Sequence, residues 1–64
     1  MYSMRMARAK VNFTKKQMAE ALEIHEQTYA KYESNPDEMS IKLAKRFSEI
    51  TGISIEDIFL AKSV

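Results

Sequence analysis

Residues 13–33, FTKKQMAEALEIHEQTYAKYE, decide the fold of this 64-residue chain. Thr14 followed by Gln17 has the spacing of a capping box, in which the hydroxyl and the amide each bind a backbone N–H group that the first turn of a helix leaves free. Apolar residues then recur at the spacing of an inner helix face. The first half of the stretch therefore predicts a helix over residues 15–22.

The second half of the stretch predicts another helix, over residues 26–34. Tyr29 and Tyr32 are three positions apart, so we expect both to point toward the core. We expect this helix to end before Pro36, because proline has no backbone N–H group to donate. His25 stands at its N-cap, where an imidazole caps poorly, so we expect a loose first turn.

A helix over residues 4–11 is predicted to precede the stretch. It would bury Met4, Ala7 and Val11 on one face. Asn12 follows it and tolerates the left-handed conformation that ends many helices.

Two more helices are predicted to follow the stretch. Ser40 is the expected N-cap of a helix that ends before Gly52, the only glycine, whose permissive φ suits a C-terminal cap. Ser54 and Asp57 repeat the capping-box spacing and predict a last helix over residues 55–61. The inner face of the longer helix is expected to consist of Ile41, Ala44, Phe47 and Ser48, with Ile50 beside them.

The composition indicates one all-α domain over residues 1–64, a compact five-helix bundle. With 45% hydrophobic and 30% charged residues, the chain is neither disordered nor collagen-like. No stretch alternates with period two, and the chain has no cysteine for a disulfide or thiolate metal site. The apolar runs are too short for a signal peptide or a membrane span. We therefore expect a cytoplasmic protein with no membrane contact.

Charge is distributed unevenly along the chain, although the formal net charge is only +1. Residues 1–16 carry five basic residues and no acidic one, whereas residues 17–40 carry six acidic residues against Lys31 alone. An anionic partner would favour the first segment and a basic partner the second. The basic residues of the first segment are Arg5, Arg8, Lys10, Lys15 and Lys16, and the acidic residues of the second are Glu20, Glu23, Glu26, Glu33, Asp37 and Glu38.

Taken together, residues 13–33 and the sequence GISIEDIF at residues 52–59 resemble the helix-turn-helix domain of the phage Cro and CI repressor family, also called the xenobiotic-response-element family. Each matching piece is weak alone, but their order and spacing cover nearly the whole chain. The resemblance implies a lambda-repressor-like DNA-binding fold. Outside residues 52–59, the matching positions are Arg8, Phe13, Thr14, Ala19, Leu22, Gln27, Thr28 and Glu33.

The chain departs from the family pattern at glycine positions. The family usually has glycine in the turn between its second and third helices, and this chain has Glu23 there. A left-handed glutamate costs about 1 kcal/mol, so we expect a slightly reshaped turn. Asn12 and Asn35 stand at two other usual glycine positions and tolerate the same conformation.

The resemblance implies that the third helix enters the major groove of DNA and presents its first turns to base edges. Gln27 would then pair with adenine, Lys31 with guanine, and Glu26 with the amino group of cytosine. On residue chemistry alone, the same side chains could form a solvated helix face. The base-reading residues carried over from the family are Glu26, Gln27, Thr28 and Lys31.

The basic segment is the expected phosphate-binding site. Lys15 and Lys16 lie on the first turn of a helix, where free N–H groups and the helix dipole favour an anion. Arg5, Arg8 and Lys10 would extend this site along the preceding helix. The alternative is an ordinary basic surface.

The resemblance implies a transcriptional regulator of the phage or prophage type that binds a double-stranded DNA operator. We expect a Cro-like protein, in which no effector or oligomerisation domain follows the predicted helices, and one such domain alone should bind weakly. We therefore expect a homodimer on a two-fold symmetric operator, with half-sites about 10 base pairs apart or a multiple of that. Phe59, Leu60 and Val64 would serve this self-association or complete the core.

The acidic middle of the chain leaves a second hypothesis open. DNA carries one negative charge per about 1.7 Å of helix, so acidic residues on a reading surface oppose its approach. The DNA-binding domain of a partner repressor is a basic surface that such residues would attract. The chain would then be an anti-repressor that contacts this partner through Glu23, Glu26 and Glu33.

No arrangement of residues indicates an enzyme. His25 is the only histidine, and there is no Ser-His-Asp set, glycine-rich phosphate loop or cluster at metal-ligand spacing. We expect no catalytic residue, metal, cofactor or small-molecule substrate.

Overall fold

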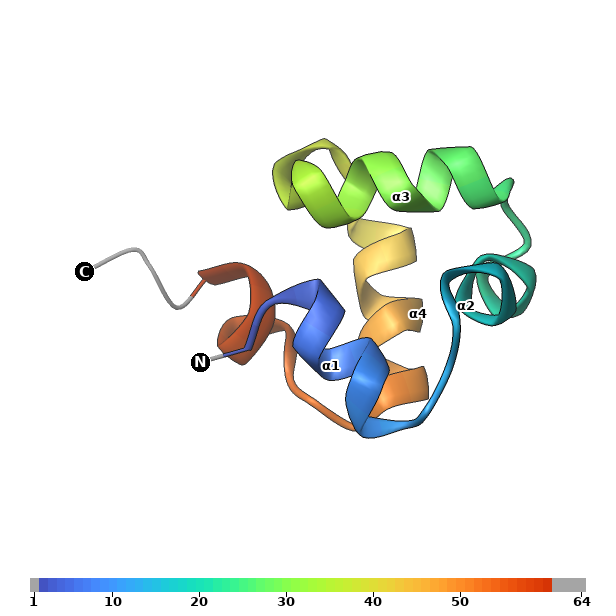
Figure 1. The fold of residues 1–64 in the computed structure, drawn as a ribbon. Helices are drawn as coiled ribbons and strands as arrows, with labels where there is room; N and C mark the ends of the chain where they lie inside the picture. Colours follow the sequence, from blue (N-terminus) through green and yellow to red (C-terminus); the bar gives the residue numbers. More distant parts are fainter. Residues whose placement is uncertain (1, 61–64) are drawn as a thin grey trace.

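The computed structural model describes residues 2–60 of the chain, and these residues form helices and no strand (Figure 1). Four α-helices and a C-terminal π-helix take the places of the five predicted helices, which confirms the all-α fold class. No helix within residues 2–60 is long and apolar enough to cross a membrane. The elements are α1 (Met4–Lys10), α2 (Lys15–Leu22), α3 (Glu26–Ser34), the 3-10 helix η1 (Pro36–Glu38), α4 (Ile41–Thr51) and the π-helix η2 (Glu56–Leu60).

Side chains at the N-termini explain where most of these helices begin. The predicted capping box of α2 is present, with the N–H group of Gln17 donating to Oγ1 of Thr14 at 3.0 Å and the N–H group of Thr14 donating to Oε1 of Gln17 at 2.8 Å. Ser40 caps α4 through the N–H group of Leu43 at 3.2 Å. His25, in contrast, makes no side-chain hydrogen bond to the start of α3. The interactions that hold α3 in place must therefore come from elsewhere in the molecule.

Left-handed residues end three of the helical segments. Gly52 has φ 75° at the end of α4, and Asn12 has φ 59° after α1, as predicted. Glu23 has φ 62° at the end of α2, so the glutamate adopts the conformation of the usual glycine. Asn35, which stands at the other usual glycine position, is not left-handed, because its φ is −135°. The proline that follows disfavours a helical backbone for the residue before it, and η1 begins at that proline.

The core lies where α1, α2 and α3 meet α4. α2 packs against α3, and both α1 and α2 pack against α4. The rings of Tyr29 and Phe47 form its centre, with centroids 6.4 Å apart and an angle of 30° between them. The buried hydrophobic cluster consists of Met4, Ala7, Met18, Ala19, Leu22, Tyr29, Met39, Phe47 and Ile53.

Ile41 does not join this core, contrary to prediction. Its side chain lies on the same stripe as Ala44 and Phe47, but it is the first residue of α4 and 75% exposed. The elements that cover the middle of the helix do not reach its end, and Met39 just before the helix is buried instead. Val11 and Tyr32, also predicted to be buried, lie half-buried at the edge of the cluster.

The two ends of the described chain lie side by side (Figure 1). The N–H group of Tyr2 donates to the carbonyl oxygen of Asp57 at 3.0 Å. Ser54 caps the last segment as predicted, accepting from the N–H group of Asp57 at 3.3 Å. The predicted self-association residues lie outside the described side chains, and residue 61, where the last helix was predicted to end, lies outside the described backbone.

The left-handed glutamate generates a stability prediction. Glu23→Gly should unfold at higher urea concentration than Glu23→Ala, by about 1 kcal/mol in free energy of unfolding, because only glycine adopts a positive φ without strain. Both variants lose the ion pair of Glu23 with Arg46, so the difference between them does not contain the loss of that pair. Equal stability of the two variants would contradict the prediction.

Candidate functional site

The outer face of α3 is a stripe of exposed polar side chains. Gln27, Lys31 and Ser34 follow one another at i, i+4 and i+7, and all three are exposed. Tyr29, on the opposite side of the helix, is fully buried. We call these three residues the reading stripe. Ser34 was not among the predicted base-reading residues, although its spacing from Gln27 places it on the same face.

The other two predicted base-reading residues flank the stripe. Glu26 is the first residue of α3 and is exposed, with no ion pair within the described part of the chain. Thr28 is half-buried on the other flank. The structure therefore brings the four predicted residues to one end and one side of α3, with Gln27 and Lys31 at the centre.

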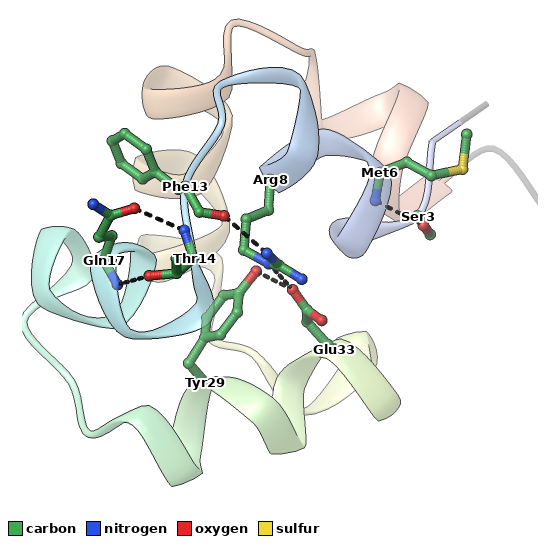
Figure 2. A network of polar contacts seen from close by, with 8 residues as sticks. All are labelled: Ser3, Met6, Arg8, Phe13, Thr14, Gln17, Tyr29 and Glu33. Atoms are coloured by element: carbon green, nitrogen blue, oxygen red, sulfur yellow. Dashed lines mark hydrogen bonds and ion pairs between the residues drawn. The ribbon is translucent and has the colours of Figure 1, made fainter.

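A buried polar network holds the inner side of α3 (Figure 2). Nε of Arg8 lies 2.6 Å from Oε2 of Glu33, and the hydroxyl of Tyr29 donates to the same oxygen at 2.6 Å. Nη1 of Arg8 also donates to the carbonyl oxygen of Phe13 at 2.8 Å. The guanidinium of Arg8 thus connects α1 both to α3 and to the segment that precedes α2.

Each member of the network has a shifted pKa. Burial raises the pKa of Tyr29, and its hydrogen bond to Glu33 raises it further. The hydrogen bond to Glu33 raises the pKa of Arg8. Burial acts to raise the pKa of Glu33, but the hydrogen bonds from Arg8 and Tyr29, together with the charges of Arg8 and Lys15, outweigh burial and lower it. The pair is therefore ionised at neutral pH.

This network removes two residues from the predicted partner surfaces. The side chains of Arg8 and Glu33 are only 15% and 8% exposed, and each already binds the other. Arg8 was predicted to contact phosphate and Glu33 to contact a protein partner. In the structure the two side chains instead bind each other across α1 and α3.

The start of α2 retains a basic surface. Lys15 and Lys16 are exposed on its first turn. The capping box uses the N–H group of Gln17, and within residues 2–60 the N–H groups of Lys15 and Lys16 make no hydrogen bond. Because Arg8 binds both Glu33 and the carbonyl oxygen of Phe13 just before α2, this end of α2 lies near the inner side of α3. Cations and free donors therefore lie close to α3.

The remaining predicted phosphate-binding residues lie on α1. Arg5 and Lys10 are both exposed. Lys10 is the last residue of α1, and this end of the helix lies on the opposite side of the molecule from α3 (Figure 1). Neither residue is brought next to the reading stripe by a contact.

Ion pairs compensate much of the acidic segment. Glu33 pairs with Arg8, Oε2 of Glu23 lies 3.7 Å from Nη2 of Arg46, and Oε1 of Glu38 lies 3.3 Å from Nζ of Lys31. Half of the six acidic residues of this segment therefore have a basic partner. A second group of exposed basic residues, which was not predicted as a site, lies on α4 and comprises Lys42, Lys45 and Arg46.

The described residues offer no alternative chemical site. Within residues 2–60, no three His, Cys, Asp or Glu side chains are grouped as metal ligands. His25 is exposed at the start of α3. The reading stripe and the start of α2 are therefore the strongest candidate site in this part of the chain.

Comparison with known proteins identifies one family. A family model described as Helix-turn-helix, of the Cro/CI type, matches residues 4–58, which is most of the chain. No curated protein and no solved structure matches. The matched region contains the reading stripe, the capping box of α2 and the buried Arg8–Glu33 pair.

The buried network generates a pH prediction. Because the folded state lowers the pKa of Glu33, its ionised form stabilises the fold above the unfolded value of about 4.3, and this contribution is lost as the pH falls through the folded value. Glu33→Gln should therefore cost about 2 kcal/mol of unfolding free energy at pH 7 and much less at pH 3. Urea unfolding at a series of pH values measures both.

Glu20→Gln is the matched control for this experiment, because Glu20 is exposed and makes no ion pair within residues 2–60. Its stability should follow that of the natural chain across the acid range. A difference between Glu33→Gln and the natural chain that stays constant from pH 7 to pH 3 would contradict the assigned role of Glu33.

Proposed function

We propose that this chain binds operator DNA with α3 in the major groove. The chain belongs to the Cro/CI-type helix-turn-helix family of DNA-binding transcription regulators. The exposed reading stripe on a helix anchored from its inner side carries this proposal. A helix in the major groove needs free polar side chains on one face and a rigid attachment on the other. We also propose that the protein is a regulator of the phage or prophage type, because it belongs to the Cro/CI-type family.

The chemistry of the stripe suggests the bases that it reads. Gln27 has the amide geometry to pair with adenine N6 and N7, and Lys31 can donate to guanine O6 and N7. Glu26 can accept a hydrogen bond from the amino group of cytosine, which would compensate for its negative charge near DNA. Thr28, half-buried at the edge, would contact a base or a thymine methyl group from the side.

The start of α2 is the proposed phosphate contact. Lys15 and Lys16 add charge to free N–H groups at a helix N-terminus, and this combination binds phosphate. Arg5 and Lys10 would act through long-range attraction, because no contact places them beside the stripe. Arg8 takes no part in the proposed contact, since its guanidinium forms an ion pair with Glu33.

A single reading stripe covers few base pairs, so we propose that two copies act together. A homodimer on a two-fold symmetric operator places two copies of α3 in successive major grooves about 10 base pairs apart. The assembly would double the number of base contacts without any change in the domain.

The anti-repressor remains the second candidate, and the charges of Glu20, Glu26 and Asp37 favour it. These three acidic residues have no ion pair within residues 2–60. Of the three residues predicted to contact a partner repressor, however, Glu33 is buried and Glu23 pairs with Arg46. Only Glu26 keeps a free charge, so the acidic surface is smaller than the sequence indicated. We therefore place DNA binding first.

Salt dependence of DNA binding tests the first candidate. Lys16→Met should weaken binding to all duplexes and lower the slope of log affinity against log salt by about 0.9, the effect of one lost phosphate contact. Lys16 is preferred to Lys15 for this substitution, because the charge of Lys15 also helps to lower the pKa of Glu33. Duplexes selected by the protein from a randomised library provide the probe, and fluorescence anisotropy at several salt concentrations gives the slope.

Lys45→Met is the matched control, since it removes the same charge from an exposed position on α4 outside the proposed site. It should leave the slope unchanged. A flat salt response of the natural chain would reject DNA binding. Stable complexes with the DNA-binding domain of a repressor, lost in Glu26→Lys and insensitive to nuclease, would favour the anti-repressor instead.

A further inference from the structure

One exposed ion pair involves a residue of the reading stripe. Nζ of Lys31 lies 3.3 Å from Oε1 of Glu38. Glu38 belongs to η1, which packs against α3 directly after that helix ends (Figure 1). The two side chains are 64% and 49% exposed. The pair therefore lies on the surface that the reading helix offers to a partner.

Glu38 and a guanine base compete for the same ammonium group. Lysine reads guanine by donating to its O6 and N7 atoms, and the carboxylate of Glu38 accepts from the same nitrogen. Exposed ion pairs are weak, because water screens them and two long side chains lose freedom. Lys31 can therefore leave Glu38 and bind a base. The free energy needed to break the Lys31–Glu38 ion pair lowers the net affinity of Lys31 for guanine.

We propose that Glu38 is a positioning residue that acts through Lys31 and determines specificity. It holds the ammonium group toward η1 and reduces the preference for guanine at the base pair opposite Lys31. This inference rests on the proposed function, because it assumes that α3 reads DNA. It adds a residue outside the reading helix to those that decide which operator is chosen.

The neighbouring acidic residue provides a control. Asp37 lies in the same turn of η1, is exposed and makes no ion pair within residues 2–60. Removal of either charge reduces repulsion from DNA phosphates, an effect that does not depend on base sequence. Of these two acidic residues, only Glu38 forms an ion pair with Lys31. A change in base preference, as opposed to overall affinity, therefore isolates the role of Glu38.

The test is a selection of duplexes from a library with about 20 randomised base pairs, enough for two half-sites. The natural chain, E38Q and D37N each select duplexes, and sequencing gives the enrichment of every base at every position. E38Q is expected to raise guanine enrichment at one position about two- to fivefold, as expected for loss of an exposed ion pair. D37N is expected to leave base preferences unchanged. E38A should reproduce the effect of E38Q.

A double variant shows whether the effect acts through Lys31. In the K31M background, E38Q should no longer change the guanine enrichment. Identical preferences for the natural chain and E38Q would overturn the inference while leaving DNA binding intact, and so would a shift that persists in K31M. No enrichment by the natural chain would overturn the proposed function and this inference with it. Circular dichroism establishes that each variant remains folded.

Discussion

The buried ion pair between Arg8 and Glu33 is the interaction on which the rest of the structure depends. It joins α1 to α3 across 25 residues of sequence, and the same guanidinium binds the carbonyl oxygen of Phe13 just before α2. Hydrogen bonds to charged groups contribute about 1.5–3 kcal/mol each, and they are lost when either partner is removed. The hydroxyl of Tyr29 adds a second donor to Glu33. These groups therefore stabilise the fold only when α1, α3 and the segment between α1 and α2 are all in place.

This constraint explains how α3 is held although it is a weak helix by local criteria. It has nine residues and no side-chain cap at its start, and isolated helices of that length are marginal in water. Its stability comes from the inner face, where Tyr29 packs against Phe47 and Glu33 binds Arg8. The outer face contributes nothing to the core. The side chains of the reading stripe are thus not required for packing of the core.

Pairing of charges also reduces the acidic character of the middle of the chain. One acidic residue of the segment is paired with α1, one with α4, and one with α3. The electrostatic potential at the surface is therefore less negative than the distribution of charge along the sequence indicates. Lys15 and Lys16 keep exposed cations at the start of α2, outside the acidic segment.

The sequence by itself determined the elements and the family, because the signals for both are local. The capping box at Thr14 and the glycine cap at Gly52 involve residues within one turn of each other, so they act in the same way in almost any context. Only the tertiary structure decided which side chains are buried and which charges are paired. Ile41 follows the inner stripe of α4 and is exposed because no neighbour reaches it, and Arg8 and Glu33 leave the predicted surfaces because they meet across 25 residues. Such contacts depend on where helices pack against one another, and no local pattern of residues encodes that position.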